Sequence, residues 1–130
     1  MKILLDTCSF IWLSQKSRKG LSKKALKLLD QNNDKLFISS ISAFELGKLL
    51  EKKKAELPTN LEEWWKREIE RYDITELSMT SLIALRSTRL ENIHNDPADR
   101  IIIATAIEHN LAILTPDKLI QKYPLVKTLW

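Results

Sequence analysis

Short apolar runs that alternate with helical stretches constrain the fold of this chain more than any other feature. Five runs have the length and character of strands: residues 2–5, 36–39, 111–114 and, less clearly, 73–75 and 126–129. Between them, apolar residues such as Leu21, Ala25 and Leu28 recur at helical spacing. Alternating strands and helices favour a parallel sheet that helices cover on both faces. The pattern predicts a three-layer α/β/α fold with a central parallel sheet of four to five strands.

The clearest predicted helix spans residues 97–109. Pro97 suits the first helical position, and Asp96 suits the cap before it. Asn110 can adopt the left-handed conformation that ends a helix. Because the segment is apolar almost all round, we expect it to lie against the sheet in the interior.

Size and composition indicate an ordinary globular domain. The 130 residues fit one domain, 1–130, and are 44% hydrophobic with two glycines. A single cysteine, Cys8, cannot form an internal disulfide, and neither it nor His94 and His109 have the spacing of a zinc site. The longest apolar run, 101–107, is too short to span a membrane, and the amino terminus lacks the apolar region of a secretion signal. We therefore expect a cytoplasmic protein with no membrane partner.

The charge balance permits a nucleic-acid partner without naming one. The chain has 21 Lys and Arg against 17 Asp and Glu, a net charge of +4. Basic residues cluster in three runs: residues 16–19, 23–27 and 48–54. These clusters are compatible with a polyanion, but they are equally typical of solvated helix faces.

Two acids follow predicted strands, where open parallel sheets bind ligands. Asp6 directly follows the run 2–5, and Asp117 follows the run 111–114 by way of Thr115 and Pro116. Each acid has a structural alternative. Asp6 could cap the following helix or turn, and Thr-Pro-Asp-Lys is an ordinary turn signature.

Two further acids lie in the first turns of predicted helices. Glu45 is on a helix that directly follows the run 36–39, so it should project over the same sheet edge as Asp6. The alternative is a capping box with Ser42, three residues earlier. Asp99 precedes a buried run and should stand near the core, whereas Asp96 is better explained as a cap.

Convergence of Asp6, Glu45, Asp99 and Asp117 at one sheet edge would need an opposing charge. Two carboxylates about 4 Å apart repel by about 4 kcal/mol at an effective dielectric near 20. A divalent cation resolves this repulsion, and oxygen ligands without histidine or cysteine favour Mg²⁺ or Mn²⁺. Such an ion can polarise a phosphodiester and generate a hydroxide nucleophile.

Four segments, in this order and spacing, carry a resemblance to a known family. They are Leu-Leu-Asp-Thr at 4–7, Ile-Ser-Ala-Phe-Glu-Leu-Gly-Lys at 41–48, Asp-Pro-Ala-Asp-Arg-Ile-Ile-Ile-Ala-Thr-Ala at 96–106 and Ile-Leu-Thr-Pro-Asp at 113–117. Together they resemble PIN domains, and specifically the VapC-type toxins of bacterial and archaeal toxin-antitoxin modules. The resemblance spans the whole chain.

The resemblance implies an endoribonuclease that depends on Mg²⁺ or Mn²⁺, cleaves single-stranded RNA and leaves a 5′-phosphate and a 3′-hydroxyl. It also implies silencing by a cognate antitoxin, and we expect the chain to form a homodimer. The basic stretches at 16–19 and 48–54 would then track the RNA backbone. Trp12, Trp64 and Trp65 could stack on bases, but their helical spacing favours positions in the core, a dimer interface or an antitoxin groove.

The family's site residues carry over to seven positions of this chain. Asp6, Glu45 and Asp99 match its core acids. Asp117 matches a fourth, more variable acid that often holds metal through water, and Asp96 matches the first acid of the Asp-Pro-x-Asp-Arg motif. The auxiliary hydroxyl positions beside the site are Thr7 and Thr115.

Two other classes of protein could share such a fold. A phosphorylatable receiver domain has parallel strands with acids at their ends, but it would have an acidic pair after the first strand, where Asp6 stands alone. A catalytically silent module that binds nucleic acid or protein could keep the same fold without turnover. Only an activity test separates that module from an enzyme.

Overall fold

The computed structural model describes residues 1–31, 35–91 and 95–130, and these form helices around one parallel sheet. The described strands are β1 (Lys2–Leu5), β2 (Lys35–Ser39), β3 (Ile74–Leu77), β4 (Ala112–Leu114) and β5 (Thr128–Leu129). All pair in parallel in the order β3-β2-β1-β4-β5. His94, considered above as a zinc ligand, lies outside the described residues.

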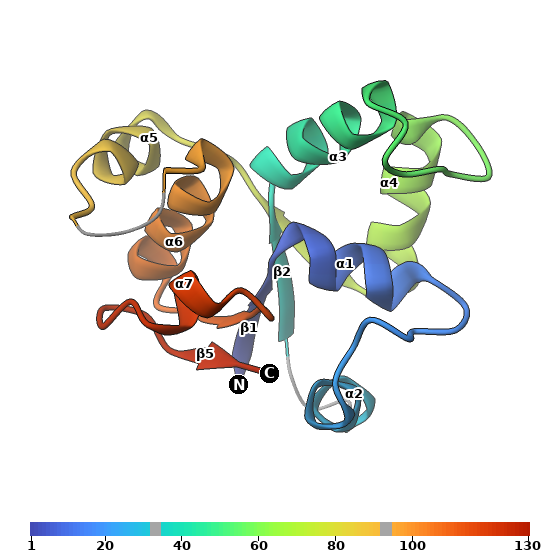
Figure 1. Cartoon of the computed structure of the whole chain (residues 1–130), viewed down its shortest axis with the longest axis horizontal. Coiled ribbons are helices and arrows are strands. Elements are labelled where there is room, and N and C mark those ends of the chain that lie inside the picture. The colour runs from blue at the N-terminus through green and yellow to red at the C-terminus, as the bar shows by residue number, and fades with distance from the viewer. Residues whose placement is uncertain (32–34, 92–94) are drawn as a thin grey trace.

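Helices cover the sheet on both sides, as the sequence predicts (Figure 1). One side carries α1 (Thr7–Ser14), α2 (Lys23–Asp30), α3 (Ile41–Glu51) and α4 (Leu61–Arg71), and the other carries α5 (Ser81–Thr88), α6 (Pro97–His109) and α7 (Lys118–Gln121). Phe10, Leu46 and Trp64 belong to the core of the first side. Ile103 and Ile120 belong to the core of the second. The three-layer α/β/α expectation is confirmed.

The central strands are the apolar runs that the sequence marks, because they are buried on both faces. Ile3, Leu4 and Leu5 are fully buried and pair with Ala112, Ile113 and Leu114. The two weaker runs at 73–75 and 126–129 become the edge strands β3 and β5, which are displaced by one or two residues. Their apolar signal is weaker because an edge strand exposes more of its surface.

The helix at 97–109 has the predicted ends. The Asp96 carboxylate caps it by accepting a hydrogen bond from the Ala98 amide at 2.8 Å, and Pro97 occupies its first turn. Asn110 ends it in the left-handed conformation with φ of 54°. Five consecutive residues from Ile102 to Ala106 are buried, so the interior position is also confirmed.

The strand order places a topological switch point beside β1. The chain runs from β1 through β2 to β3 on one side, and then crosses to build β4 and β5 on the other. Receiver domains have the order 2-1-3-4-5, in which β1 lies between β2 and β3. Here β1 lies between β2 and β4, which excludes the receiver alternative. Ligands of open α/β sheets bind beyond the carboxyl ends of the strands at such a point.

The tryptophans mainly serve packing. Trp64 is buried, and its ring centroid lies 5.3 Å from that of Phe10. Trp12 contacts Trp130 and covers Gly20, where a Cβ atom would come within 2.2 Å of the Trp12 ring. The core interpretation of Trp64 is confirmed. Within the described residues, no helix has the length and apolar character to cross a bilayer.

Candidate active site

Asp6 occupies the carboxyl end of β1 at the switch point, and local hydrogen bonds fix both of its carboxylate oxygens. One oxygen, Oδ1, accepts from the Ser9 amide at 2.8 Å, which makes Asp6 the N-cap of α1. The other, Oδ2, accepts from the Thr115 hydroxyl at 2.6 Å. The side chain is only 6% exposed. The capping alternative is therefore correct, and it holds the carboxylate in place at the end of the strand.

Thr115 joins Asp6 to Asp117 across the switch point. Its buried hydroxyl donates to Asp6 and accepts from the Asp117 amide at 3.1 Å. Asp117 in turn caps the short helix α7, because its Oδ1 accepts from the amides of Leu119 and Ile120 at 2.8 and 3.1 Å. Asp117 is thus a helix cap rather than a residue of a simple turn, and its half-buried carboxylate stands beside Asp6.

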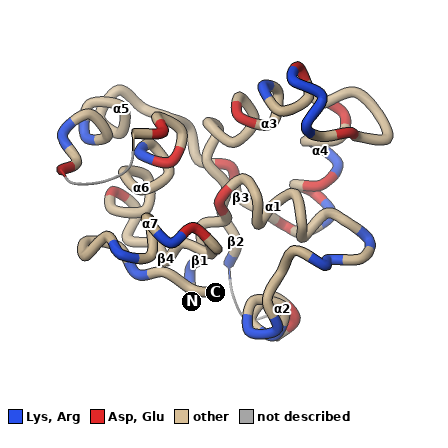
Figure 2. The backbone as a smooth tube through the Cα atoms, viewed as in Figure 1, with Lys and Arg blue, Asp and Glu red and all other residues tan. Residues whose placement is uncertain are grey.

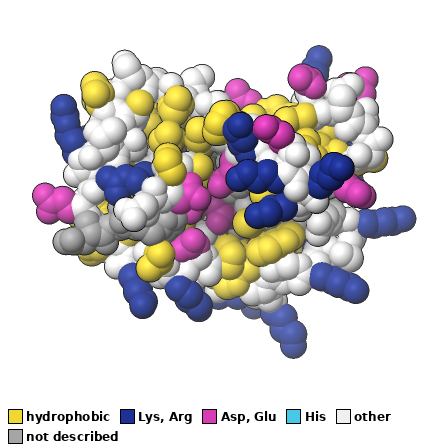
Figure 3. All heavy atoms as spheres, turned by 45° about the horizontal axis from the view of Figure 1, so that its top comes forward, with side chains coloured by type: hydrophobic (Ala, Val, Ile, Leu, Met, Phe, Trp, Pro, Cys, Tyr) yellow, Lys and Arg dark blue, Asp and Glu magenta, His cyan; other side chains and the backbone are white. Residues whose placement is uncertain are grey.

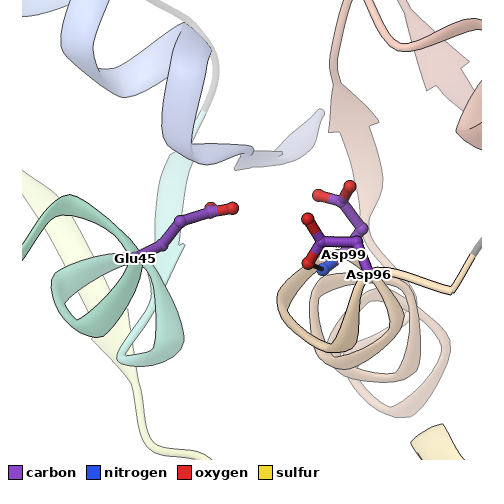
Figure 4. A group of neighbouring side chains, drawn as sticks. All are labelled: Glu45, Asp96 and Asp99. Atoms are coloured by element: carbon purple, nitrogen blue, oxygen red, sulfur yellow. Dashed lines mark hydrogen bonds between the residues drawn. The ribbon is translucent and has the colours of Figure 1, made fainter. Parts of the chain in front are cut away.

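Glu45 does not form the capping box that its spacing from Ser42 suggests, so that alternative is wrong. Helix α3 begins one residue before Ser42, with Ser40 at its N-cap and no side-chain cap. The buried Ser42 hydroxyl instead forms a hydrogen bond with the Thr7 hydroxyl at 2.9 Å. Thr7 also hydrogen bonds to the Glu45 carboxylate. Glu45 is therefore available to project across the site toward α6, as Figure 4 shows.

Three carboxylates meet where α3 faces the start of α6 (Figure 4). Glu45, Asp96 and Asp99 each offer an oxygen, and these oxygens all lie within 4.8 Å of one another. Two oxygen ligands on opposite sides of a Mg²⁺ ion are about 4 Å apart. The distances between the three carboxylate oxygens are thus close to the distances between ligands of one ion. Their donor chemistry also fits a hard divalent cation.

The five acids form one electrostatic group. Burial and then the charges of Asp96, Glu45, Asp117 and Asp6 raise the pKa of Asp99 to about 8. Burial is also the main cause that raises the pKa of Asp6 and of Glu45 above their ordinary values. Each raised pKa reports that a negative charge is costly here, and a bound cation would remove that cost.

Cys8 lies close enough to the acids to feel their charges. Burial and then the carboxylates of Asp6 and Glu45 raise the pKa of its thiol to about 12. A thiol with such a pKa stays protonated at neutral pH and makes a poor nucleophile. Cys8 is therefore a poor candidate for a nucleophile in this site.

All seven predicted positions gather at one edge of the sheet, in two subgroups. Asp6, Thr115 and Asp117 form a hydrogen-bonded corner between β1 and β4. Glu45, Asp96 and Asp99 form the open cluster beside it, with Thr7 touching Glu45. Figure 3 shows acidic side chains gathered in the middle of this face.

The sequence does not predict the contacts that two serines make in the site. Ser9 binds Asp6 through its amide, and its hydroxyl donates to the Leu114 carbonyl at 2.7 Å. The capping rule could have found its amide, since Ser9 is three residues after Asp6. The contact of Ser42 with Thr7 depends on the packing of α1 against α3, which no local pattern specifies.

The fold and the site together define an α/β protein with a cluster of acids at a topological switch point, and the donor chemistry of this cluster fits a divalent cation. The profile of one family, described as PIN domain, matches residues 3–125. The chain therefore belongs to the PIN domain family. It is 30% identical to Ribonuclease VapC22 of Mycobacterium tuberculosis over 131 aligned residues. The alignment covers 98% of each chain.

Solved structures share the fold. VapBC2 from Rickettsia felis, bound to a DNA fragment from its promoter, contains a chain that matches with a TM-score of 0.72 and 16% identity, over 99% of this chain and 98% of that one. VapBC-1 from nontypeable Haemophilus influenzae matches with a TM-score of 0.67 and 20% identity, over 99% and 97%. At these identities the two likenesses support the architecture alone.

Proposed function

We propose that this chain is a metal-dependent endoribonuclease and the toxin of a toxin-antitoxin pair. The observation that carries the proposal is the meeting of Glu45, Asp96 and Asp99 beside the buried Asp6, on a PIN domain. The name of the Mycobacterium tuberculosis relative supports ribonuclease activity. A solved structure described as a toxin-antitoxin complex from Klebsiella pneumoniae matches this chain with a TM-score of 0.65 and 24% identity, over 95% of this chain and 94% of that one, which supports an antitoxin partner.

The cofactor we propose is Mg²⁺ or Mn²⁺. Glu45, Asp96 and Asp99 would hold the ion, with Asp6 and Asp117 next to them, directly or through water. When bound, such an ion would polarise a phosphodiester and activate water as a nucleophile.

The chain's own residues hold the acids in place and oppose part of the effect that burial has on their charge. Ser9 and Thr115 donate to Asp6, and both hydrogen bonds favour its carboxylate form against the effect of burial. Thr7 does the same for Glu45. Asp96 fixes the start of α6 by capping it, and thereby places Asp99 in the first turn. The site is thus organised by hydrogen bonds from hydroxyl and amide groups.

The partners we propose are a single-stranded RNA substrate, a cognate antitoxin and a second copy of the chain in a homodimer. A reducing cytoplasm suits a protein whose sequence has one cysteine. Figure 2 shows basic positions on the segment after α3 and acidic positions at the start of α6. Basic residues near the acids would attract the phosphates of an RNA chain.

A cleavage assay with matched variants tests the proposal. The wild-type chain should cut a mixed-sequence single-stranded RNA in Mg²⁺ or Mn²⁺ and not in EDTA, leaving a 5′-phosphate and a 3′-hydroxyl. Asp6→Asn and Asp99→Asn should fold and lose cleavage. Asp73→Asn is the control, since Asp73 lies at the opposite end of the sheet and Asn tolerates its φ of 50°.

Two results would reject the proposal. One is equal cleavage by Asp6→Asn, Asp99→Asn and wild type, which would trace the activity to another site or to a contaminant. The other is a folded wild type that cuts no RNA in either metal, which would favour the catalytically silent module. In cells, induced expression of wild type should arrest growth, and Asp99→Asn should not.

A further inference from the structure

A groove opens directly beside the acid cluster, between α3 and the start of α6. Its volume is about 310 Å³, at the lower end of the roughly 300–1,000 Å³ that is usual for ligand pockets. Glu45 and Asp96 line both the groove and the acid cluster. A molecule bound at the acids can therefore extend into the groove without a gap.

Phe44 provides an exposed aromatic wall of this groove. Phe44 directly precedes Glu45 in the sequence, and its side chain is 60% exposed. The Lys48 ammonium lies 5.7 Å from the centre of the Phe44 ring, on the same groove. An exposed aromatic ring next to a cation is the combination that binds single-stranded nucleic acid, because bases stack on the ring while phosphates meet the charge.

Three lysines line the groove: Lys48, Lys52 and Lys54. Lys48 contacts Glu51 at 3.2 Å, whereas within the described ranges no carboxylate lies within ion-pair distance of Lys52 or Lys54. Lys53 does not line the groove. Figure 3 shows a group of Lys and Arg side chains directly beside the acidic patch.

The end of α3 fixes which lysines face the groove. Lys53 has a left-handed φ of 57°, its amide donates to the Leu50 carbonyl at 3.0 Å, and the Lys54 amide donates to the Leu49 carbonyl at 2.8 Å. This hydrogen-bond pair is the Schellman motif, which reverses the chain direction at a helix end. Lys52 and Lys54 are thereby fixed around the turn, and Lys53 serves as a natural control with the same charge.

We infer that this groove binds one nucleotide of single-stranded RNA next to the scissile phosphate. Phe44 stacks on the base, and Lys52 and Lys54 hold a phosphate. The inference rests on the proposed ribonuclease function and adds the subsite that positions its substrate. A polyanion complements the three lysines. A second copy of the chain does not, since a two-fold interface would bring the same lysines from both copies together.

Equilibrium binding tests the subsite without relying on turnover. The probe is a fluorescein-labelled 12-nucleotide RNA of mixed sequence, in EDTA, with Asp99→Asn as the common background so that no cleavage occurs. Phe44→Ala should weaken binding roughly tenfold, within the range for one stacked base. Phe44→Trp should restore it. Leu85→Ala is the control, because Leu85 is exposed on α5 and does not line the groove.

The salt dependence of RNA affinity distinguishes the contribution of the lysines from that of Phe44. Each phosphate contact contributes about 0.7 to the slope of log affinity against log salt for a single strand. Lys52→Gln with Lys54→Gln should reduce the slope by about 0.7, the value for one phosphate, whereas Lys53→Gln and Phe44→Ala should leave it unchanged. On a 12-mer of abasic ribose phosphates, Phe44→Ala should bind as tightly as its background, because no base is left to stack.

Three outcomes would overturn the subsite. Equal RNA affinity for Phe44→Ala, the lysine pair and the controls would do so while wild-type cleavage still supports the proposed function. Failure of the Asp99→Asn background to bind RNA at low salt would do the same. If the Phe44 variant or the lysine pair differs from its background in the mass measured by light scattering but not in RNA affinity, the groove is an interface between copies of the chain. If wild type cuts no RNA but the predicted losses in binding appear, the subsite stands and the proposed activity falls.

Discussion

Two regions of this molecule bury carboxylates, and they solve the problem of buried charge in opposite ways. On α4, Glu68 is only 2% exposed and lies 3.6 Å from Arg71 and 4.0 Å from Arg67. At the switch point, the charges of four other carboxylates add to the effect of burial in raising the pKa of Asp99. The first region carries its own compensating cations, and the second concentrates like charge. Burial of an acid therefore does not by itself indicate a metal site, whereas like charge around the acid favours one.

The largest difference should come from a matched pair of substitutions. Glu45→Gln should lower RNA cleavage by more than about 100-fold, since even the groups that orient metal ligands are worth about 10–100-fold. Glu68→Gln should leave cleavage unchanged, because Glu68 lies among arginines away from the acids. Single-turnover cleavage at saturating Mg²⁺ measures both. Similar losses in the two variants would break the distinction between the regions.

A smaller loss of activity should follow from Thr115→Val. The substitution keeps the side-chain volume but removes the hydroxyl that donates to Asp6 and accepts from the Asp117 amide. Cleavage should fall by about 10–100-fold, the usual effect of losing a group that orients a ligand. Circular dichroism provides the check that the fold is intact. Full activity in this variant would show that Asp6 needs no such support.

The free energy of unfolding should rank the same two variants in the opposite order to their RNA cleavage. Glu68→Gln should lower the free energy of unfolding by about 1–2 kcal/mol, less than the 3–5 kcal/mol of a fully buried pair, since both arginines are more than half exposed. Glu45→Gln should leave the metal-free protein as stable as wild type or more so, because it removes a repelling charge. Urea unfolding monitored by tryptophan fluorescence measures both. A marked loss in Glu45→Gln would contradict the repulsion argument.

The pH dependence of stability should report on the acids. Asp99 has a folded pKa of about 8, above its ordinary value of 3.8, so between these pH values the unfolded chain has released a proton that the folded chain still holds. Metal-free stability should therefore fall as pH rises from about 4 to about 8 and then level off. Millimolar Mn²⁺ should raise the melting temperature and flatten the fall, because it binds the folded state. A flat metal-free profile that Mn²⁺ leaves unchanged would be contrary to this account.

The sequence predicts the layers of the fold and the position of the site because both depend on local patterns. Apolar periodicity reports burial, and Asp6 and Asp117 follow apolar runs directly. The role of Glu45 was harder to assign, because its spacing from Ser42 also fits a capping box. Only the start of α3 at Ile41 decides between the two.

Tertiary packing decides the features that the sequence leaves open. The turn at Lys53 separates lysines that look equivalent in the sequence. Glu68 was missed, although it lies four residues from both Trp64 and Tyr72 and so shares the buried stripe of its helix. Its helical position signals burial, but its pairing with two arginines depends on how α4 lies in the fold.

The most direct test of the acid site is to locate a metal by anomalous scattering from crystals soaked in Mn²⁺. The account predicts a Mn²⁺ peak among Glu45, Asp96 and Asp99 in the wild-type chain, no peak beside Glu68, and loss of the first peak in Asp99→Asn. A peak that survives in Asp99→Asn, or saturating Mn²⁺ with no peak at these three acids, would contradict the claim that converging carboxylates form a metal centre.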